Sequence, residues 1–265
     1  MEHKILHTTR GHVHYWTGGS GSACVVFTHG ATMDHGLFDY QTDQFAKHYR
    51  VITWDVPAHG LSRPYENFSL HNAAEDLFEI IQTEGENKVH LVGQSMGGYI
   101  SQVLAVSHPM AVASFTAVGS SPIQLSYYSK LDRWLLSKTP EILNFYPYNS
   151  LIKFTADQIT CTTNSRDYAF RTLSTLTKAE ISNIMTSVYR GLIEYDQQKL
   201  KIPMLITYGE LDRTGKVKQY CDRWAINEGL DLRVISKAAH NANMDNPEEF
   251  NAILMNFLNR LTTTG

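Results

Sequence analysis

A serine flanked by glycines is the feature of this sequence most able to do chemistry. Gly93-Gln94-Ser95-Met96-Gly97 follows the apolar run Val89–Val92 and precedes a helical pattern over Tyr99–Ser107. A G-x-S-x-G sequence between a strand and a helix predicts a sharp turn that lifts the serine hydroxyl out of the sheet. Glycines two positions to either side leave room for that turn, and the start of the helix places partial positive charge beside the hydroxyl. Ser95 is therefore a candidate nucleophile, which needs a base, a residue that orients the base, and donors for an oxyanion.

Asp212 and His240 are the candidate partners of this serine. Asp212 follows the apolar run Ile202–Tyr208, and His240 follows the run Leu230–Ile235. Because the ends of parallel strands open at the same edge of a sheet, both side chains can meet Ser95 there. His240 would take the proton of Ser95 and return it to the leaving group, while Asp212 would fix the imidazole tautomer.

Two other acids compete with Asp212 for that role. Glu210 lies two residues away, out of the strand phase of Asp212, and Asp231 begins a strand rather than ending one. We therefore expect Asp212 to be the acid. The residue after the nucleophile, Met96, is expected to supply one backbone N–H to the oxyanion hole.

The elements that must position these residues follow an alternation of short apolar runs and amphipathic stretches, which indicates a mainly parallel sheet covered by helices. Strands are predicted at Lys4–Thr9, Val13–Thr17, Ala23–Thr28, Tyr49–Trp54, Lys88–Val92, Val112–Val118, Ile202–Tyr208 and Leu230–Ile235, and helices at Phe38–His48, Leu70–Glu84, Tyr99–Ser107, 216–228 and Pro247–Leu261. Residues 121–199 carry clustered aromatics and no strand pattern, which predicts a mostly helical insertion. The domain prediction is therefore a core formed by residues 1–120 and 200–265, with 121–199 inserted into it.

Four ordered features resemble the α/β-hydrolase superfamily, and the likeness covers nearly the whole chain. They are Phe27-Thr28-His29-Gly30, Asp55-Val56-Pro57-Ala58-His59-Gly60, the Ser95 turn, and Gly209-Glu210-Leu211-Asp212 with Ala239-His240-Asn241. The likeness is greatest to the esterase, haloperoxidase and aminopeptidase-like branch, although Ala58 stands where that branch often has glycine. The resemblance implies an α/β-hydrolase fold with a helical cap between the sixth and seventh strands. It also implies a second oxyanion donor at the backbone of Ala31 and a structural role for His29.

The cap would supply the substrate pocket. Aromatic side chains of the insertion and residues just after the oxyanion loop are the candidate lining residues: Tyr127, Trp134 and Phe145 in the first group, and Met33, His35 and Phe38 in the second. Aromatic residues in a small helical layer mostly pack against the core below them, so only some of these are expected to touch a ligand.

The expected activity is that of a serine hydrolase acting on an ester, thioester or lactone through an acyl-enzyme, without a cofactor. A serine at the nucleophile position argues against haloalkane and epoxide hydrolysis, which use an aspartate in this family. The turn also differs from the Gly-Gly-Ser-Trp-Gly of proline iminopeptidases, so peptidase activity ranks lower. Two other functions stay open on this scaffold: a cofactor-free lyase or oxygenase, and a slow-turnover ligand receptor.

Composition limits the partners. The net charge of −3 over 265 residues gives no basic surface for nucleic acid. His12 and His14 form an H-x-H pair, but alternation along a half-exposed strand explains this spacing, and we expect no metal site. The three cysteines match no zinc or disulfide pattern, and no apolar stretch approaches a membrane span. We expect a cytoplasmic protein whose partner is a small-molecule acyl substrate; the oligomeric state is not determined by the sequence.

Overall fold

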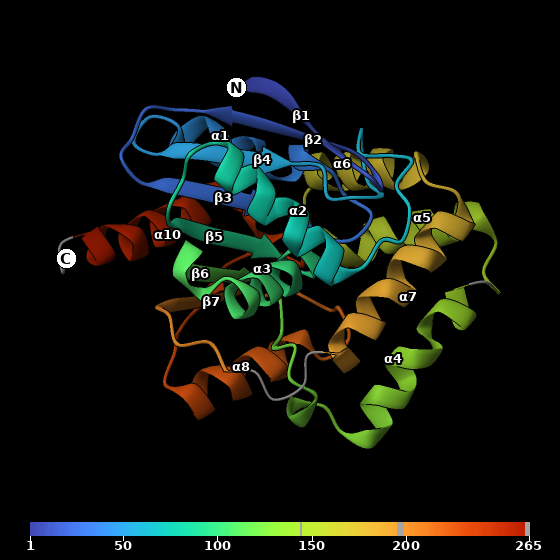
Figure 1. Ribbon diagram of the computed structural model, residues 1–265. Helices are drawn as coiled ribbons and strands as arrows, with labels where there is room; N and C mark the ends of the chain where they lie inside the picture. Colours follow the sequence, from blue (N-terminus) through green and yellow to red (C-terminus); the bar gives the residue numbers. More distant parts are fainter. Residues whose placement is uncertain (144, 195–198, 263–265) are drawn as a thin grey trace.

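The sheet of this protein places its strands in the order β1-β2-β4-β3-β5-β6-β7-β8 (Figure 1). The computed structural model describes residues 1–143, 145–194 and 199–262. The strands are β1 (Glu2–Thr8), β2 (Gly11–Gly18), β3 (Cys24–Thr28), β4 (Arg50–Trp54), β5 (Val89–Gln94), β6 (Val112–Val118), β7 (Met204–Gly209) and β8 (Asp231–Ile235). β2 pairs antiparallel with β1 and β4, and the remaining pairs are parallel. The mainly parallel sheet that the sequence predicted is thus confirmed.

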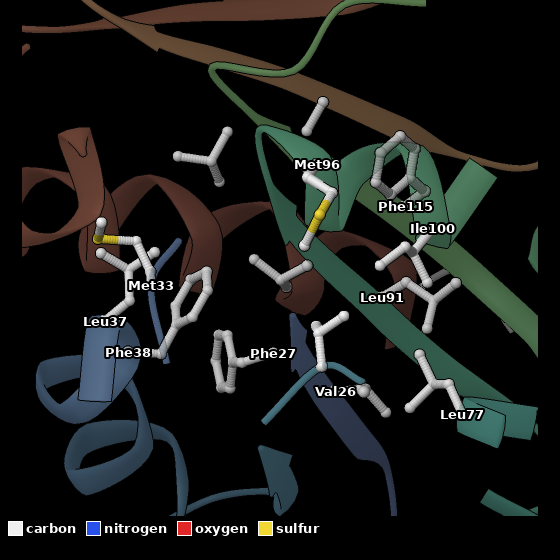
Figure 2. Packing of buried hydrophobic residues seen from close by; sticks show 14 of the residues in the cluster. Val26, Phe27, Met33, Leu37, Phe38, Leu77, Leu91, Met96, Ile100 and Phe115 are labelled. Carbon is white, nitrogen blue, oxygen red and sulfur yellow. The ribbon is translucent and has the colours of Figure 1, made fainter. Parts of the chain in front are cut away.

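The central strands are buried along their whole length and mostly apolar, because both faces of the sheet are covered. β3 reads Cys-Val-Val-Phe-Thr and β5 reads Val-His-Leu-Val-Gly-Gln, and every residue of both is buried. Runs of this kind are typical of parallel strands between two helical layers. Figure 2 shows the resulting packing, in which Val26 and Phe27 of β3 and Leu91 of β5 lie beside side chains of the flanking helices.

Helices cover the two faces of this sheet. They are α1 (Asp39–Phe45), α2 (Leu70–Thr83), α3 (Met96–Ser107), α8 (Val217–Glu228), α9 (Ala242–Asp245) and α10 (Pro247–Thr262), with short 3₁₀ turns η1 (His35–Phe38), η2 (Pro109–Ala111) and η3 (Leu125–Tyr127). α2 and α3 pack together on one face, while α1 and α10 pack on the other (Figure 1). α8 contacts β7 and β8. None of the helices in the described part of the chain is both long and apolar enough to cross a bilayer.

Four further helices lie between β6 and β7. They are α4 (Lys130–Leu143), α5 (Tyr148–Ile159), α6 (Thr163–Ser174) and α7 (Lys178–Glu194), which we call the inserted helices. α4 packs against α7 and α5 against α6, and the group lies on the side toward which β5 points (Figure 1). The limits 120/121 and 199/200 stay predictions: β6 ends at Val118, β7 begins at Met204, and residues 195–198 lie outside the described part of the chain.

Candidate active site

Ser95 occupies a strained turn between β5 and α3. Its backbone has φ 50° and ψ −115°, a conformation that costs a non-glycine residue roughly 1–3 kcal/mol. Two hydrogen bonds hold it: the Ser95 N–H donates to the Val118 carbonyl (2.9 Å), and the Ser120 hydroxyl donates to the Ser95 carbonyl (2.8 Å). Both partners lie at or just beyond the end of β6, so the neighbouring strand fixes the turn.

The two glycines that flank Ser95 have no room for a side chain. A Cβ on Gly97 would lie 2.1 Å from the Thr28 carbonyl oxygen, and a Cβ on Gly93 would lie 2.5 Å from the Gly97 carbonyl carbon. These obstacles are backbone atoms, which cannot turn aside as a flexible side chain can. The close approach of α3 to β3 and β5 therefore requires glycine at both positions.

His240 and Asp212 are hydrogen-bonded to each other at this edge of the sheet. The His240 Nδ1 lies 2.9 Å from the Asp212 Oδ2, and both residues are buried. Because an ionised carboxylate only accepts, Nδ1 donates and Nε2 keeps its lone pair. Burial alone would raise the pKa of Asp212, but attraction to His240, their hydrogen bond and the Thr214 N–H (2.8 Å from Oδ1) outweigh it and hold that pKa below its ordinary value. The acid is thus kept ionised beside the imidazole.

The two rival acids make their bonds elsewhere. The Glu210 carboxylate is exposed and accepts from the Lys237 N–H at 3.0 Å. Asp231, at the start of β8, pairs with Arg233 and Arg260. The acid that His240 contacts is therefore Asp212.

Ser95 and His240 line one cavity of about 190 Å³, together with Ala31 and Met33 from the loop after β3. The other wall comes from the inserted helices: Thr139, Leu151, Thr155, Ile159, Leu173, Ile181 and Met185. Gln94, Thr214 and Asn241 complete the lining with Thr32. Apart from His240, none of these described lining residues is ionisable. The cavity therefore favours a neutral, largely apolar group next to the serine.

Ala31 and Met96, the two residues expected to supply oxyanion donors, both lie in segments next to Ser95. A Cβ on Gly30, next to Ala31, would lie 3.2 Å from the Ser95 Cβ, so this loop passes close to Ser95. Met96 is the first residue of α3, and N–H groups in the first turn of a helix have no acceptor within the helix.

Two polar residues that sequence reasoning missed tie these loops together. The Gln94 Nε2 donates to the His240 carbonyl (3.1 Å) and to the Asn241 Oδ1 (3.3 Å), and both residues are almost fully buried. The only indication of these two residues in the sequence is their position next to candidate site residues: Gln94 precedes Ser95, and Asn241 follows His240. Their bonds join the end of β5 to the loop that carries the imidazole.

His35 and Phe38 were predicted to line the pocket, and the structure places both elsewhere. Phe38 is fully buried in the core, with its ring 5.1 Å from that of Phe27 (Figure 2). His35 donates from Nδ1 to the Asp55 carboxylate at 2.7 Å and stacks on Trp16. The turn η1 directs these side chains into the core and toward β4, whereas Met33, just before it, reaches the cavity.

Tyr127, Trp134 and Phe145 also lie outside the cavity lining. Tyr127 is buried against α8, where its hydroxyl donates to Glu228 at 3.0 Å. Trp134 is 57% exposed and Phe145 is 87% exposed. The inserted helices instead present Met185 together with aliphatic and threonine side chains to the cavity, so these three aromatic residues do not line it.

His29 is buried and structural in its contacts. Its Nε2 accepts the Val56 N–H at 2.9 Å, which joins the loop after β3 to the turn after β4. Burial lowers the pKa of His29 to about 4 and that of His59 to about 3, so both are neutral at physiological pH.

The histidines of the first hairpin form cross-strand pairs. His7 and His12 lie 2.9 Å apart at Nδ1, and His3 Nε2 lies 2.9 Å from His14 Nδ1. In the described part of the chain, no three His, Cys, Asp or Glu side chains gather as a metal site would require.

A larger cavity, of about 400 Å³, lies between the segment 58–68 and α7. Arg63, Glu180 and Asn183 are among its lining residues, and none of Ser95, Asp212 and His240 is. A larger volume does not by itself indicate an active site. The smaller cavity, which Ser95 and His240 line, is therefore the candidate active site.

Comparison with known proteins identifies the family of this fold. Residues 24–247 match the family model described as alpha/beta hydrolase fold. The pimeloyl-[acyl-carrier protein] methyl ester esterase of Yersinia pseudotuberculosis serotype IB (strain PB1/+) is 26% identical over 260 residues, covering 92% of this chain and 96% of the relative. The 3-oxoadipate enol-lactonase 1 of Acinetobacter baylyi is 32% identical over 104 residues, 39% of each chain. The solved structure of a hydrolase from Pseudomonas aeruginosa PA01 superposes with a TM-score of 0.81 at 17% identity, covering 97% of this chain and 98% of that one. The chain belongs to the α/β hydrolase fold family.

Proposed function

We propose that this protein is a serine hydrolase that cleaves a carboxylic ester, thioester or lactone of a small neutral acyl group. The observation that carries the proposal is the arrangement of one cavity: a strained Ser95 and a buried His240, with the imidazole Nδ1 bonded to Asp212 at 2.9 Å. A nucleophile, a base and an orienting acid in this relation are the parts that acyl transfer requires. Membership of the α/β hydrolase fold family and the esterase and lactonase names of its relatives support the same reaction class.

The reaction follows from the atoms at the site. The Ser95 Oγ attacks the acyl carbon while the His240 Nε2 takes its proton, and the N–H groups of Ala31 and Met96 stabilise the oxyanion. The tetrahedral intermediate collapses, and the imidazolium returns the proton to the leaving alcohol or thiol. Water, deprotonated by His240, then attacks the acyl-enzyme, and the acid leaves as Ser95 is regenerated. Asp212 stays ionised throughout and stabilises the imidazolium.

The cavity indicates the size of the acyl group. A cavity of roughly 150 Å³ holds one benzene molecule, so about 190 Å³ accommodates roughly six to eight non-hydrogen atoms. The inserted helices form the far wall with Leu151, Ile159 and Ile181, and we propose that they act as a cap over the site. Because the described lining holds no lysine or arginine, a carboxylate on the acyl chain would be buried unpaired, at a high cost.

The partner is therefore a small-molecule acyl substrate. We also propose a cytoplasmic location, because Cys24, Cys161 and Cys221 are all free thiols in the structure.

The test combines one variant with a substrate series. Ser95→Ala should lower kcat by at least about 10³-fold while leaving the thermal unfolding temperature nearly unchanged. The wild-type enzyme should hydrolyse p-nitrophenyl esters best at acyl chains of about four to eight carbons, and a fluorophosphonate should label Ser95. If Ser95 does not label while His240→Ala abolishes turnover of a natural substrate, acyl chemistry is the wrong class and the lyase or oxygenase alternative takes its place.

A further inference from the structure

Asp245, at the end of α9, is a buried carboxylate that bonds to two separate parts of the chain. On one side it accepts from the turn between α5 and α6: from the Cys161 N–H (3.1 and 3.2 Å), the Thr162 N–H (3.2 Å) and the Thr162 hydroxyl (3.1 Å). On the other side its Oδ2 accepts the Ala239 N–H at 2.9 Å. Ala239 directly precedes His240. One carboxylate thus joins the inserted helices to the loop of the proposed base.

Two more bonds join the same two segments. The Asn241 N–H donates to the Ile159 carbonyl at 2.9 Å, and the Cys161 thiol donates to the Lys237 carbonyl at 3.0 Å. The turn between α5 and α6 therefore contacts the loop on both sides of His240.

The backbone of this loop needs external support. Lys237 has a backbone φ of 50°, in the left-handed region that residues other than glycine and asparagine rarely adopt. Strained residues of this kind persist only where their surroundings hold them. Asp212 binds the imidazole at Nδ1, whereas the backbone bonds at Ala239 and Asn241 go to Asp245 and to the α5–α6 turn. Asp245 and that turn therefore support the loop backbone on either side of the imidazole, in addition to the Gln94 bond to the His240 carbonyl and the Leu211 N–H bond to the Ala238 carbonyl.

A carboxylate at position 245 suits these partners better than another polar side chain would. All the partners of Asp245 named above are donors, and an ionised carboxylate is the side chain that can only accept. An asparagine would turn an NH₂ group toward at least one N–H group and break either the Ala239 bond or the bonds to the turn.

We propose that Asp245 is a positioning residue that holds the His240 loop against the turn between α5 and α6, so that the imidazole keeps its reach to Ser95. Asp245 is not among the described residues that line the cavity, and it acts on catalysis through His240. The inference rests on the proposed function, because it assumes that His240 is the base. It also makes the cap helix α5, which lines the cavity with Leu151, Thr155 and Ile159, part of the support of the base.

The first test is Asp245→Asn with a matched control. The variant should lower kcat for a short p-nitrophenyl ester by about 10- to 100-fold, since small misplacements of a catalytic group have effects of that size, with KM changed less than about threefold. Asp157→Asn is the control: Asp157 of α5 pairs with Arg166 of α6, so its loss weakens the same two helices without touching the His240 loop. Turnover of the control should stay near that of the wild-type enzyme. An equal loss of kcat in both variants would overturn the proposal.

A double-mutant cycle separates positioning from general loosening of the site. If Asp245 acts through His240, Asp245→Asn should have no further effect on the residual turnover of His240→Ala, because residues that act as a unit are not additive. A further loss of the same size in the double variant would show a merely structural role. If His240→Ala itself leaves ester turnover intact, the proposed function fails instead, so the two failures are distinguishable.

A second pair of variants keeps the proposal testable if Asp245→Asn does not fold. Thr162→Val removes a single group, the hydroxyl that both donates to Asp245 and caps α6. This variant should lower kcat by about 3- to 10-fold. Thr162→Ser keeps the hydroxyl and should restore the wild-type rate. Equal rates for the valine and serine variants would contradict the proposed link.

Discussion

Asp212→Asn perturbs the proposed triad at a single atom. In the structure, Oδ1 accepts the Thr214 N–H at 2.8 Å and Oδ2 accepts from the His240 Nδ1 at 2.9 Å. An asparagine has one oxygen for these two donors. Thr214 offers an N–H that cannot reverse its role, whereas an imidazole can change tautomer. The amide oxygen should therefore face Thr214, and the NH₂ group should face His240.

The consequence is an imidazole in the wrong tautomer. With the NH₂ of the introduced asparagine donating to Nδ1, the proton of His240 moves to Nε2, which can then no longer accept the proton of Ser95. The opposite orientation would leave the Thr214 N–H buried without an acceptor, at a cost of about 1–3 kcal/mol. The imidazolium also loses its ionised partner in the transition state. A change of this kind lowers kcat by about 10⁴-fold in serine proteases, and we expect a similar loss here. Since Asp212 is not among the described residues that line the cavity, KM should change little.

The assay is the hydrolysis of p-nitrophenyl butyrate at neutral pH, with kcat and KM determined separately and folding checked by circular dichroism. Glu210→Gln is the matched control, because Glu210 is exposed and only two residues away. A kcat for Asp212→Asn within about tenfold of the wild-type value would refute the reasoning. A large loss in Glu210→Gln together with a silent Asp212→Asn would show that the acid is misassigned.

The remaining predictions concern stability. Gly97→Ala should lower the free energy of unfolding by about 1–3 kcal/mol or more, because its Cβ would lie 2.1 Å from the Thr28 carbonyl oxygen. Urea unfolding measures this loss. The control is Gly85→Asn, at φ +74° with nothing within 4 Å of its Cβ, which should be close to neutral. His35→Gln should lose more stability near pH 5 than near pH 9. Burial alone would lower the pKa of His35 and raise that of Asp55, but their hydrogen bond and attraction outweigh it, so the pKa of His35 lies above 6.5 and that of Asp55 below 3.8. The pair contributes its full stabilisation between pH 3.8 and pH 6.5, and this stabilisation is lost as the pH rises through the folded-state pKa of His35. Urea titrations of wild type and His35→Gln at about pH 5 and pH 9 measure the loss of unfolding free energy. A loss near pH 9 equal to or larger than that near pH 5 would contradict the prediction.

Local chemistry in the sequence determined the fold class and brought attention to the three residues of the proposed triad. Gly93 and Gly97 are recognisable because they form one short motif with Ser95, although the backbone that leaves no room for a side chain at Gly97 is that of Thr28 in β3. Asp212 and His240 are recognisable because a parallel sheet brings the ends of its strands to one edge, whatever lies between them in the chain. The strands were predicted to within about two residues for similar reasons, since period and apolarity are local properties.

Only the tertiary structure decided which side chains face the cavity and which residues hold the loop of His240, the proposed base. Phe38 and Trp134 are both large and aromatic, yet Phe38 is fully buried in the core and Trp134 is 57% exposed. An apolar pattern indicates that a residue favours burial, but it does not indicate the surface against which that residue packs. The helix predicted from Phe38 begins instead at Asp39, after the turn η1. Asp245 is the strongest case: its donors at Cys161 and Thr162 lie more than eighty residues away in the chain. Contacts at that separation depend on how the inserted helices dock on the sheet, and that docking is a property of the whole packed chain.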